Sequence, residues 1–213
     1  MATKKIYLIR HGQTDYNLKG IVQGSKVNTS LNDLGRAQAN AFFEHYKEIA
    51  FDKIYTSILN RSKESVAQFV NLGIPHEAYE GLNEISWGFR DGTEITKQED
   101  DYYFQVLKQW SAGNLDLKIE GGESPLDVIE RQKPVIEIIN SRTEEENILV
   151  CMHGRAIRII LCLLLNKPLV EMDSFSHENL CLYLLESDEN GGYKVLKYND
   201  VTHLIEQNLR SAK

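Results

Sequence analysis

The chain has 213 residues, of which 42% are hydrophobic and 26% charged, the composition of an ordinary globular protein. A domain of this size buries about 70% of the surface that its unfolded chain exposes, so it can form one large core. The formal net charge of −7 argues against a general nucleic-acid-binding surface, which needs a basic stripe. The longest unbroken apolar run, at 159–165, is far shorter than the ~20 residues that cross a bilayer, so we expect no membrane association.

The N-terminal residues and the cysteines favour a cytoplasmic protein. Residues 1–5 lead directly into the first expected strand and leave no room for a signal peptide. Cys151, Cys162 and Cys181 lie among apolar residues without a Cys-x-x-Cys spacing, which is typical of buried, reduced thiols. We therefore expect a cytoplasmic location and no catalytic role for Cys151.

Strands and helices alternate in the first part of the chain. An apolar, β-prone run predicts a strand at 5–9, and a polar loop follows at 18–30. Asn32 is suited to cap the next helix, in which Ala39 and Phe42 mark the buried stripe. The further elements expected here are a strand at 53–56, a helix at 59–72 and a short extended segment at 76–79.

The middle of the chain interrupts this alternation. Between Leu82 and Glu120 the periodicity weakens and glycines recur, with one helix expected at 96–110. We expect residues 85–120 to be an insertion that covers the sheet edge and the substrate. The insertion would belong to a single domain that spans residues 1–213.

The last part of the chain returns to strands and helices. Ser124, Pro125 and Asp127 form a helix-start signal, and Pro134 is expected to kink the helix that follows. The remaining expected elements are a central apolar strand at 148–152, a buried helix at 156–165, and strands at 180–185 and 193–198. Together the elements predict an α/β fold, a three-layer α/β/α sandwich around a mostly parallel central sheet.

Two of the expected strands end in the same kind of sequence. The first is followed by Arg10-His11-Gly12, and the apolar run at 147–152 by His153-Gly154. Open α/β sheets bind ligands at the carboxyl ends of their strands, and backbone N–H groups at a helix start favour an anion. A histidine with one free ring nitrogen is a nucleophile, and a neighbouring arginine stabilises a phosphoryl group. A lone histidine is better explained as structural, but the repeated design predicts a phosphate site.

Two further side chains supply what phosphoryl transfer needs. Arg61 follows the strand at 53–56 and faces the same edge, and its guanidinium can grip two phosphate oxygens. Glu84 stands near Ile85 and Trp87, and an apolar surrounding would let its carboxyl hold a proton for the leaving oxygen. An ordinary loop carboxylate in a capping role is the alternative interpretation of Glu84.

These residues are part of a longer set of motifs that extends over nearly the whole chain. In chain order the set is Arg10-His11-Gly12-x-Thr14-x-x-Asn17, Gln23-Gly24, Leu31-x-x-Leu34-Gly35, Thr56-Ser57-x-x-x-Arg61, Leu82-Asn83-Glu84-Ile85, Gly122-Glu123-Ser124 and His153-Gly154-x-x-x-Arg158. In this order the set resembles the histidine phosphatase superfamily, also called the phosphoglycerate mutase-like family.

The resemblance implies a phosphoglycerate mutase-like fold and a role for each matching residue. His11 would be the nucleophile that forms a phosphohistidine, and Glu84 would be the acid and then the base for water. The residues implied to bind phosphate or substrate are Arg10, Gly12, Thr14, Asn17, Gln23, Gly24, Arg61, His153 and Gly154. Asn17 and Gln23 are equally explained as turn residues. The implied mechanism requires no metal ion and no organic cofactor.

Three functions fit these residues. The favoured one is a phosphomonoester hydrolase that acts through a phosphohistidine on a small phosphorylated metabolite. A phosphotransferase of the phosphoglycerate mutase type needs extra cations over the site, whereas residues 85–120 hold four positive and seven negative charges. Mutases of the family also carry His-Gly-Asn-Ser where this chain has His-Gly-Arg-Ala. A non-catalytic phosphate-binding module would be expected to lack His11 or Glu84.

The expected partner is the small phosphorylated substrate itself. The acidic charge and the absence of a long apolar run indicate neither a nucleic acid nor a membrane as a partner. The strand edge after Leu180 allows pairing with a second copy of the chain, so a homodimer fits the sequence as well as a monomer.

Overall fold

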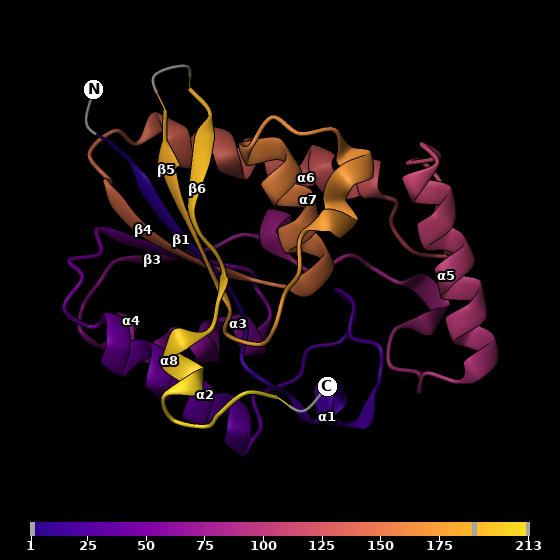
Figure 1. Ribbon diagram of the computed structural model, residues 1–213, viewed down its shortest axis with the longest axis horizontal. Helices are drawn as coiled ribbons and strands as arrows, with labels where there is room; N and C mark the ends of the chain where they lie inside the picture. The colour runs from indigo at the N-terminus through magenta and orange to yellow at the C-terminus, as the bar shows by residue number, and fades with distance from the viewer. Residues whose placement is uncertain (1–2, 189–190, 212–213) are drawn as a thin grey trace.

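One sheet of six strands organises the protein. A computed structural model describes residues 3–188 and 191–211, except for the side chains of residues 98 and 99. The strands lie in the order β3-β2-β4-β1-β5-β6 (Figure 1). They are β1 (Lys5–Arg10), β2 (Lys53–Thr56), β3 (His76–Ala78), β4 (Asn147–Met152), β5 (Leu182–Ser187) and β6 (Tyr193–Asp200). Strands β1 to β4 pair in parallel and β5 and β6 pair antiparallel, which confirms the mostly parallel sheet.

Helices cover both faces of this sheet. The α-helices are α1 (Asp15–Lys19), α2 (Asp33–Tyr46), α3 (Asn60–Ser65), α4 (Ala67–Asn71), α5 (Lys97–Ser111), α6 (Pro125–Ser141), α7 (Gly154–Leu164) and α8 (Thr202–Ile205). Short 3₁₀ helices are η1 (Glu80–Leu82), η2 (Gly88–Arg90) and η3 (Leu169–Ser174). Figure 1 shows α6 and α7 on one side of the sheet and α2, α3, α4 and α8 on the other, so the three-layer architecture is confirmed. Within the described ranges, no helix is both long and apolar enough to cross a membrane.

Strands β1 and β4 form the centre of the core. Ile9 and Cys151, which face each other in register, are both fully buried, as a continuous apolar strand requires. The register continues to Arg10 and Met152. Because the two strands are parallel, the residues that follow them emerge at the same edge of the sheet.

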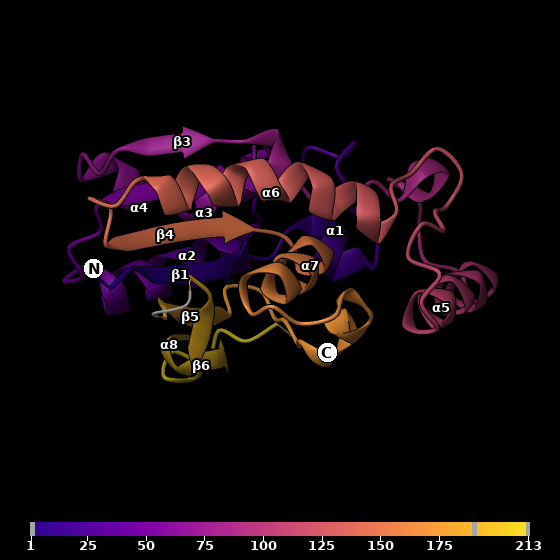
Figure 2. The same cartoon turned by 90° about the horizontal axis from the view of Figure 1, so that it is seen from above.

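Helix α5 stands apart from the two helical layers. Both views place it beyond the sheet, on the side toward which β4 points (Figures 1 and 2). It is anchored by Val106 and Trp110, which are buried in the same apolar cluster as the sheet. On its other side Phe104 is 60% exposed. This segment therefore lies over the edge at which β1 and β4 end.

Several elements differ from those expected. The helix expected at 59–72 is two helices, α3 and α4, separated at Val66, whose φ of −118° is not helical. A short helix, α1, lies in the region expected to lead into a loop, and Thr14 caps it. Helix α6 begins with the predicted cap and runs as one helix through Pro134, the position at which a kink is expected. The buried helix begins at Gly154, two residues earlier than expected.

The segment after α8 returns to the loop that follows β1. The hydroxyl of Ser211 accepts a hydrogen bond from Nε2 of Gln13 at 3.1 Å and donates to Oδ1 of Asn179 at 3.2 Å. The side-chain amide of Asn179 donates in turn to the carbonyl oxygen of His11 at 3.0 Å. Ser211 therefore helps to hold the loop that carries His11.

Gly35→Ala is predicted to disturb this loop. A Cβ at residue 35 would lie 2.0 Å from the carbonyl oxygen of Gln13, so either the start of α2 or the loop must move. Glycine-to-alanine changes in open helices stabilise by roughly 0.5–1 kcal/mol. Here overpacking should instead lower the free energy of unfolding by about 1–3 kcal/mol, as measured by urea denaturation.

Arg36→Ala is the control for this experiment. Arg36 follows Gly35 in α2 and its side chain is 58% exposed, so its replacement should change the free energy of unfolding by less than about 0.5 kcal/mol. A Gly35→Ala protein as stable as the parent would contradict the close approach of α2 and the loop.

Candidate active site

β1 ends at Arg10, and His11 continues the pairing with β4 by one residue. The N–H of His11 donates to the carbonyl oxygen of Met152 at 3.0 Å. The His11 ring is buried, and its Nδ1 lies 2.7 Å from the carbonyl oxygen of Gly12. Because a carbonyl oxygen only accepts, Nδ1 carries the proton and Nε2 keeps its lone pair. His11 is thus held in the tautomer that a nucleophile needs.

His153 lies beside His11 at the end of β4, with the two ring centroids 5.1 Å apart. Nε of Arg61 donates to Nδ1 of His153 at 3.2 Å, so Nε2 of His153 carries the proton and donates to the Ser57 hydroxyl at 2.7 Å. Arg61 is fully buried, and its other nitrogens donate to carbonyl oxygens in the loop 24–27. The structure thus brings together both histidines and the arginine that were predicted to meet.

Burial keeps both histidines neutral at pH 7. It is the main cause that holds the pKa of His11 and of His153 well below 6.5, and the charges of Arg61 and Arg10 act in the same direction. Burial also lowers the pKa of Arg61, to about 10, which leaves it cationic at pH 7. The result is a neutral imidazole nucleophile among fixed positive charges.

The Glu84 carboxylate caps the first turn of α7. Its oxygens accept hydrogen bonds from the backbone N–H of Arg155 at 3.1 Å and of Ala156 at 2.9 Å. The apolar surrounding expected for this carboxyl is only partly present, since Ile85 is buried next to it but the oxygens meet helix donors. These two N–H groups of α7, expected to favour a phosphate, bind Glu84 instead. The same contacts hold Glu84 in the wall of the cavity described below.

Arg131, which the sequence did not identify, fixes the loop that carries Glu84. Its guanidinium donates to the carbonyl oxygens of Gly81 at 2.9 Å, Asn83 at 3.0 Å and Glu84 at 3.1 Å. An ion pair with Glu123, 2.8 Å between Nε and Oε1, orients the guanidinium. The Gly122-Glu123-Ser124 motif therefore acts through Arg131.

Thr14, Asn17 and Gln23 form one hydrogen-bonded group beside His11. Thr14 and Asn17 make a reciprocal capping box at the start of α1. The hydroxyls of Thr14 and Thr29 donate to Oε1 of Gln23 at 2.9 and 2.6 Å. Asn17 and Gln23 also line the cavity, whereas Thr14 is buried behind them. The turn role and the site position of Asn17 thus coincide.

The predicted glycines allow close approach of the backbone. A Cβ at Gly12 would lie 2.7 Å from a backbone oxygen of α2, and one at Gly24 2.0 Å from a carboxylate oxygen of Asp91. A Cβ at Gly154 would lie 2.7 Å from the ring of His177. Of these three, Gly154 lines the cavity, and Gly12 and Gly24 are not among its lining residues.

A cavity of about 470 Å³ opens beside His11. The predicted site residues that line it are Arg10, His11, Asn17, Gln23, Glu84 and Gly154. Other lining residues come from the segment 85–120 and from α7, and they include Trp87, Arg90, Tyr103, Phe104, Arg155 and Arg158. Among residues 3–188 and 191–211, no three His, Cys, Asp or Glu side chains are grouped so that they could hold a metal ion.

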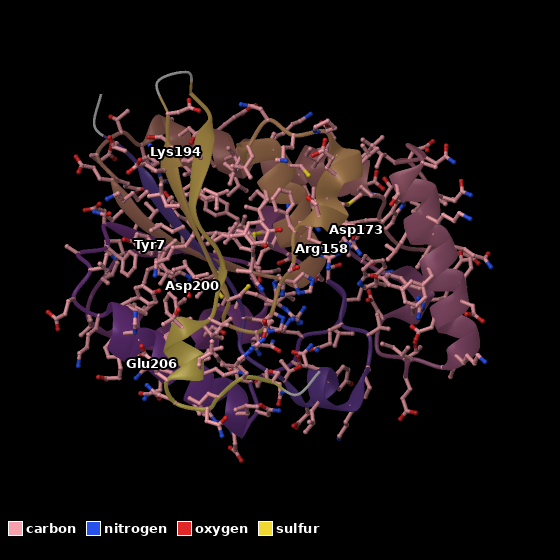
Figure 3. All side chains as sticks on the ribbon, viewed as in Figure 1. Tyr7, Arg158, Asp173, Lys194, Asp200 and Glu206 are labelled. Carbon is pink, nitrogen blue, oxygen red and sulfur yellow. The ribbon has the colours of Figure 1, made fainter. Side chains whose placement is uncertain are left out.

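The cavity walls contain donors without acceptors. Four lining side chains have a buried nitrogen for which the described residues offer no hydrogen-bond partner, namely Nε of Arg10, Arg90 and Arg158 and Nε2 of Gln23. Arg158 does pair through another nitrogen with Asp173, and Figure 3 shows the two side by side near the end of the sheet. Buried donors without acceptors cost free energy, so this wall suits a ligand rich in anionic oxygens.

His177 is a site residue that the sequence did not reveal. Its Nδ1 lies 3.3 Å from a terminal nitrogen of Arg10 and accepts from it, and the ring lines the cavity. Burial, followed by the charge of Arg10, lowers the pKa of His177 to about 2, so it acts as a neutral acceptor. His203, by contrast, packs inside the protein, where its Nε2 bonds the carbonyl oxygen of Leu180 at 3.0 Å.

Comparison with known protein sequences finds one family and several related enzymes. The family described as the histidine phosphatase superfamily (branch 1) matches residues 6–201. A 6-phosphofructo-2-kinase/fructose-2,6-bisphosphatase of Gallus gallus is 33% identical over 172 residues, which cover 79% of this chain and 34% of the relative. The chain thus spans about a third of the length of that relative. Phosphoserine phosphatase 1 of Hydrogenobacter thermophilus is 26% identical over 205 residues, 95% of each chain.

Solved structures with the same fold cover nearly the whole chain. A protein titled mycobacterial hydrolase 1 matches with a TM-score of 0.83 at 24% identity, over 93% of this chain and 99% of its own. A mycobacterial glucosyl-3-phosphoglycerate phosphatase matches with a TM-score of 0.80 at 23% identity, over 92% and 99% of the two chains. YhfR of Bacillus stearothermophilus has a TM-score of 0.80 at 27% identity, over 94% and 99%.

The free energy of unfolding is predicted to fall as the pH drops below 6.5. His11, His153 and His177 are buried with a lowered pKa, whereas each titrates near 6.5 in the unfolded chain. Below that pH the unfolded state binds more protons than the folded state, so stability that is full at higher pH is lost. Urea denaturation between pH 7.5 and 5.5 measures the change, which approaches about 1.4 kcal/mol per pH unit for each histidine.

His177→Gln tests whether the buried histidines cause this change of the free energy of unfolding with pH. The variant retains a side chain that can accept a hydrogen bond from Arg10 but removes one proton-binding group, so its stability should depend less steeply on pH in this window. A parent protein that becomes more stable toward pH 5.5 would contradict the neutral state of these rings.

Proposed function

Since the chain belongs to the histidine phosphatase superfamily (branch 1), a family of phosphoryl-transfer enzymes, we propose that it hydrolyses a small phosphomonoester through a phosphohistidine on His11. This proposal rests on one observation, that an unprotonated imidazole nitrogen and buried hydrogen-bond donors without a described acceptor occur together in the cavity. Nε2 of His11 is unprotonated because Nδ1 donates to Gly12, and the side chains of Arg10 and Gln23, which line the same cavity, hold buried donors for which the described residues offer no acceptor. A phosphoryl group supplies both the electrophile and the missing acceptors.

The reaction follows in two steps. Nε2 of His11 attacks phosphorus, the bond from phosphorus to the ester oxygen breaks, and the Glu84 carboxyl gives that oxygen its proton. Glu84 then takes a proton from water, whose oxygen attacks phosphorus as the bond to Nε2 breaks. Inorganic phosphate leaves, and His11 and the reprotonated Glu84 return to their starting states. Arg10 would donate to the transferred group, and the charge of Arg61 would stabilise it from behind the cavity wall, since its nitrogens are bonded to His153 and to loop carbonyl oxygens. His153, whose ring nitrogens bond Arg61 and Ser57, would hold that guanidinium in place.

The segment 85–120 is proposed to determine which ester is accepted. It contributes Trp87, Arg90, Tyr103 and Phe104 to the cavity wall, whereas Arg10 and His11 come from the end of β1. Of the charged residues in this segment, Arg90 and Asp100 line the cavity. The net negative charge of the segment therefore does not describe the surface that a substrate would meet.

A phosphotransferase of the mutase type is the second candidate, because it shares the first step and differs in what accepts the phosphoryl group. Hydrolysis is favoured by the similarity to phosphoserine phosphatase 1, which extends over 95% of both chains. An experiment must decide whether water or a second hydroxyl group accepts the phosphoryl group from His11.

The test measures both products and the covalent intermediate. The protein is incubated with ³²P-labelled 3-phosphoglycerate and with simple phosphomonoesters, and free phosphate, isomerised ester and acid-labile phosphate on the protein are quantified. We expect release of phosphate and a labelled intermediate. His11→Ala should abolish the label and lower kcat/KM by roughly 10⁴-fold or more. His45→Ala, a change on the outer face of α2, is the control and should keep both.

Each alternative gives a different result. Rapid isomerisation with little free phosphate would replace the hydrolase by a mutase-type phosphotransferase. The absence of both turnover and labelling with every ester would favour a non-catalytic phosphate-binding module. A label that persists in His11→Ala would refute the assignment of the nucleophile.

A further inference from the structure

Arg90 ends the short helix η2 and lines the same cavity as His11. It is almost completely buried, with 2% of its surface exposed. Within the part of the chain that the structure describes, its guanidinium has no hydrogen-bond or ion-pair partner, and its Nε is buried without an acceptor. Its charge lies over the ring of Tyr103, 5.4 Å from the centroid.

Four acidic residues whose side chains the structure describes could pair with Arg90, but none of them does. Asp91, the next residue, accepts hydrogen bonds within its own turn. Glu84 accepts the backbone N–H groups of α7, and Asp173 pairs with two other arginines. Asp100, whose side chain is described, lines the cavity but forms no ion pair with Arg90. Among the side chains that the structure describes, Arg90 therefore has no counter-ion.

A buried guanidinium in this state is costly for the folded protein. Its solvation is lost on burial, and the face of one aromatic ring compensates only part of that loss. Such a group persists where the ligand supplies the missing partner. The unpaired charge therefore indicates an anion as the missing occupant of this part of the cavity.

The phosphoryl group at His11 does not require Arg90. His11 already has Arg10 and Arg61 beside it, and these are the cations that act most strongly on its ring. Arg90 comes from a different element, η2, and lies over Tyr103, whose ring centroid is 5.2 Å from that of Trp87. A cavity of about 470 Å³, which both Arg90 and His11 line, has room for a small organic group beside the phosphoryl group.

We propose that Arg90 binds a second anionic group of the substrate, a carboxylate or a second phosphate, while the scissile phosphoryl group lies at His11. This inference rests on the proposed phosphatase function and adds the substrate class, which is phosphomonoesters that carry a further acidic group. A guanidinium fork pairs with two oxygens of either anion, and the aromatic wall packs against the carbon skeleton.

Matched pairs of esters test the proposal in the parent protein. O-phosphoserine and O-phosphoethanolamine differ by one carboxylate, and propane-1,3-diol bisphosphate and its monophosphate differ by one phosphate. We expect kcat/KM to be about 10- to 100-fold higher for the more acidic member of one pair. The pair that shows this preference identifies the anion. Equal kcat/KM values within both pairs would overturn the inference and leave the phosphatase function intact.

Two variants assign the preference to one side chain. Arg90→Gln should reduce the preference at least about tenfold, because it removes the charge and the fork. Lys108→Gln, on the exposed surface of α5, removes the same charge outside the cavity and should keep the preference. An Arg90→Gln protein that keeps the full preference would also overturn the inference.

Binding separates this inference from the proposed function. In His11→Ala, which cannot form the phosphohistidine, calorimetry with the same esters should still show tighter binding of the acidic member, and Arg90→Gln in that background should abolish the difference. If the acidic esters bind more tightly but the parent protein turns over none of them, the Arg90 site is supported and the hydrolase function is refuted. Equal affinities within each pair would refute the site.

Thermal unfolding distinguishes a ligand-binding role from a structural one. Removal of an unpaired buried charge should leave the Tm of Arg90→Gln unchanged or raise it. A lowered Tm, together with an equal loss of kcat/KM for both members of each pair, would make Arg90 a structural residue and overturn the proposal.

Discussion

The parallel pairing of β1 with β4 is the constraint on which the site depends. Its register sets Arg10 opposite Met152, so the two chain segments that leave the sheet do so side by side. His11 and His153 meet there, and Arg61 reaches them from the helix after β2, the other neighbour of β4. A shift of one residue in this register would send alternate side chains to the opposite face and separate the histidines.

In the described part of the chain, the site holds more buried hydrogen-bond donors and positive charges than acceptors to pair with them. Its donors and cations are buried, and several have no acceptor among the described residues, while Glu84, the predicted proton donor, is held by the backbone of α7. The surrounding apolar core of β1, β4 and α7 supplies the stability that such a site costs. Ligand oxygens supply the missing acceptors. The site therefore lowers the stability of the free protein, and ligand binding raises the stability of the complex.

The sequence predicted the elements that depend on local pattern, and it missed the contacts that depend on tertiary approach. The strands, the caps at Asn32 and Ser124, and the meeting of His11 with His153 follow from apolar runs, capping residues and parallel strand ends. The contact of His177 with Arg10 has no local signal, because it requires the chain after η3 to fold back across the sheet edge. The net charge of residues 85–120 likewise did not predict the charge of the cavity wall, since only the fold determines which charged side chains face the cavity.

Ser211 has a consequence for protein engineering. Its hydroxyl connects Gln13 with Asn179, although it lies 198 positions after Gln13 in the chain. A truncation or mutant library designed to spare the reactive centre must therefore also spare this remote segment. Conversely, substitutions in this segment offer directed evolution a way to adjust the rigidity of the loop that carries His11 without changing any residue that contacts the ester.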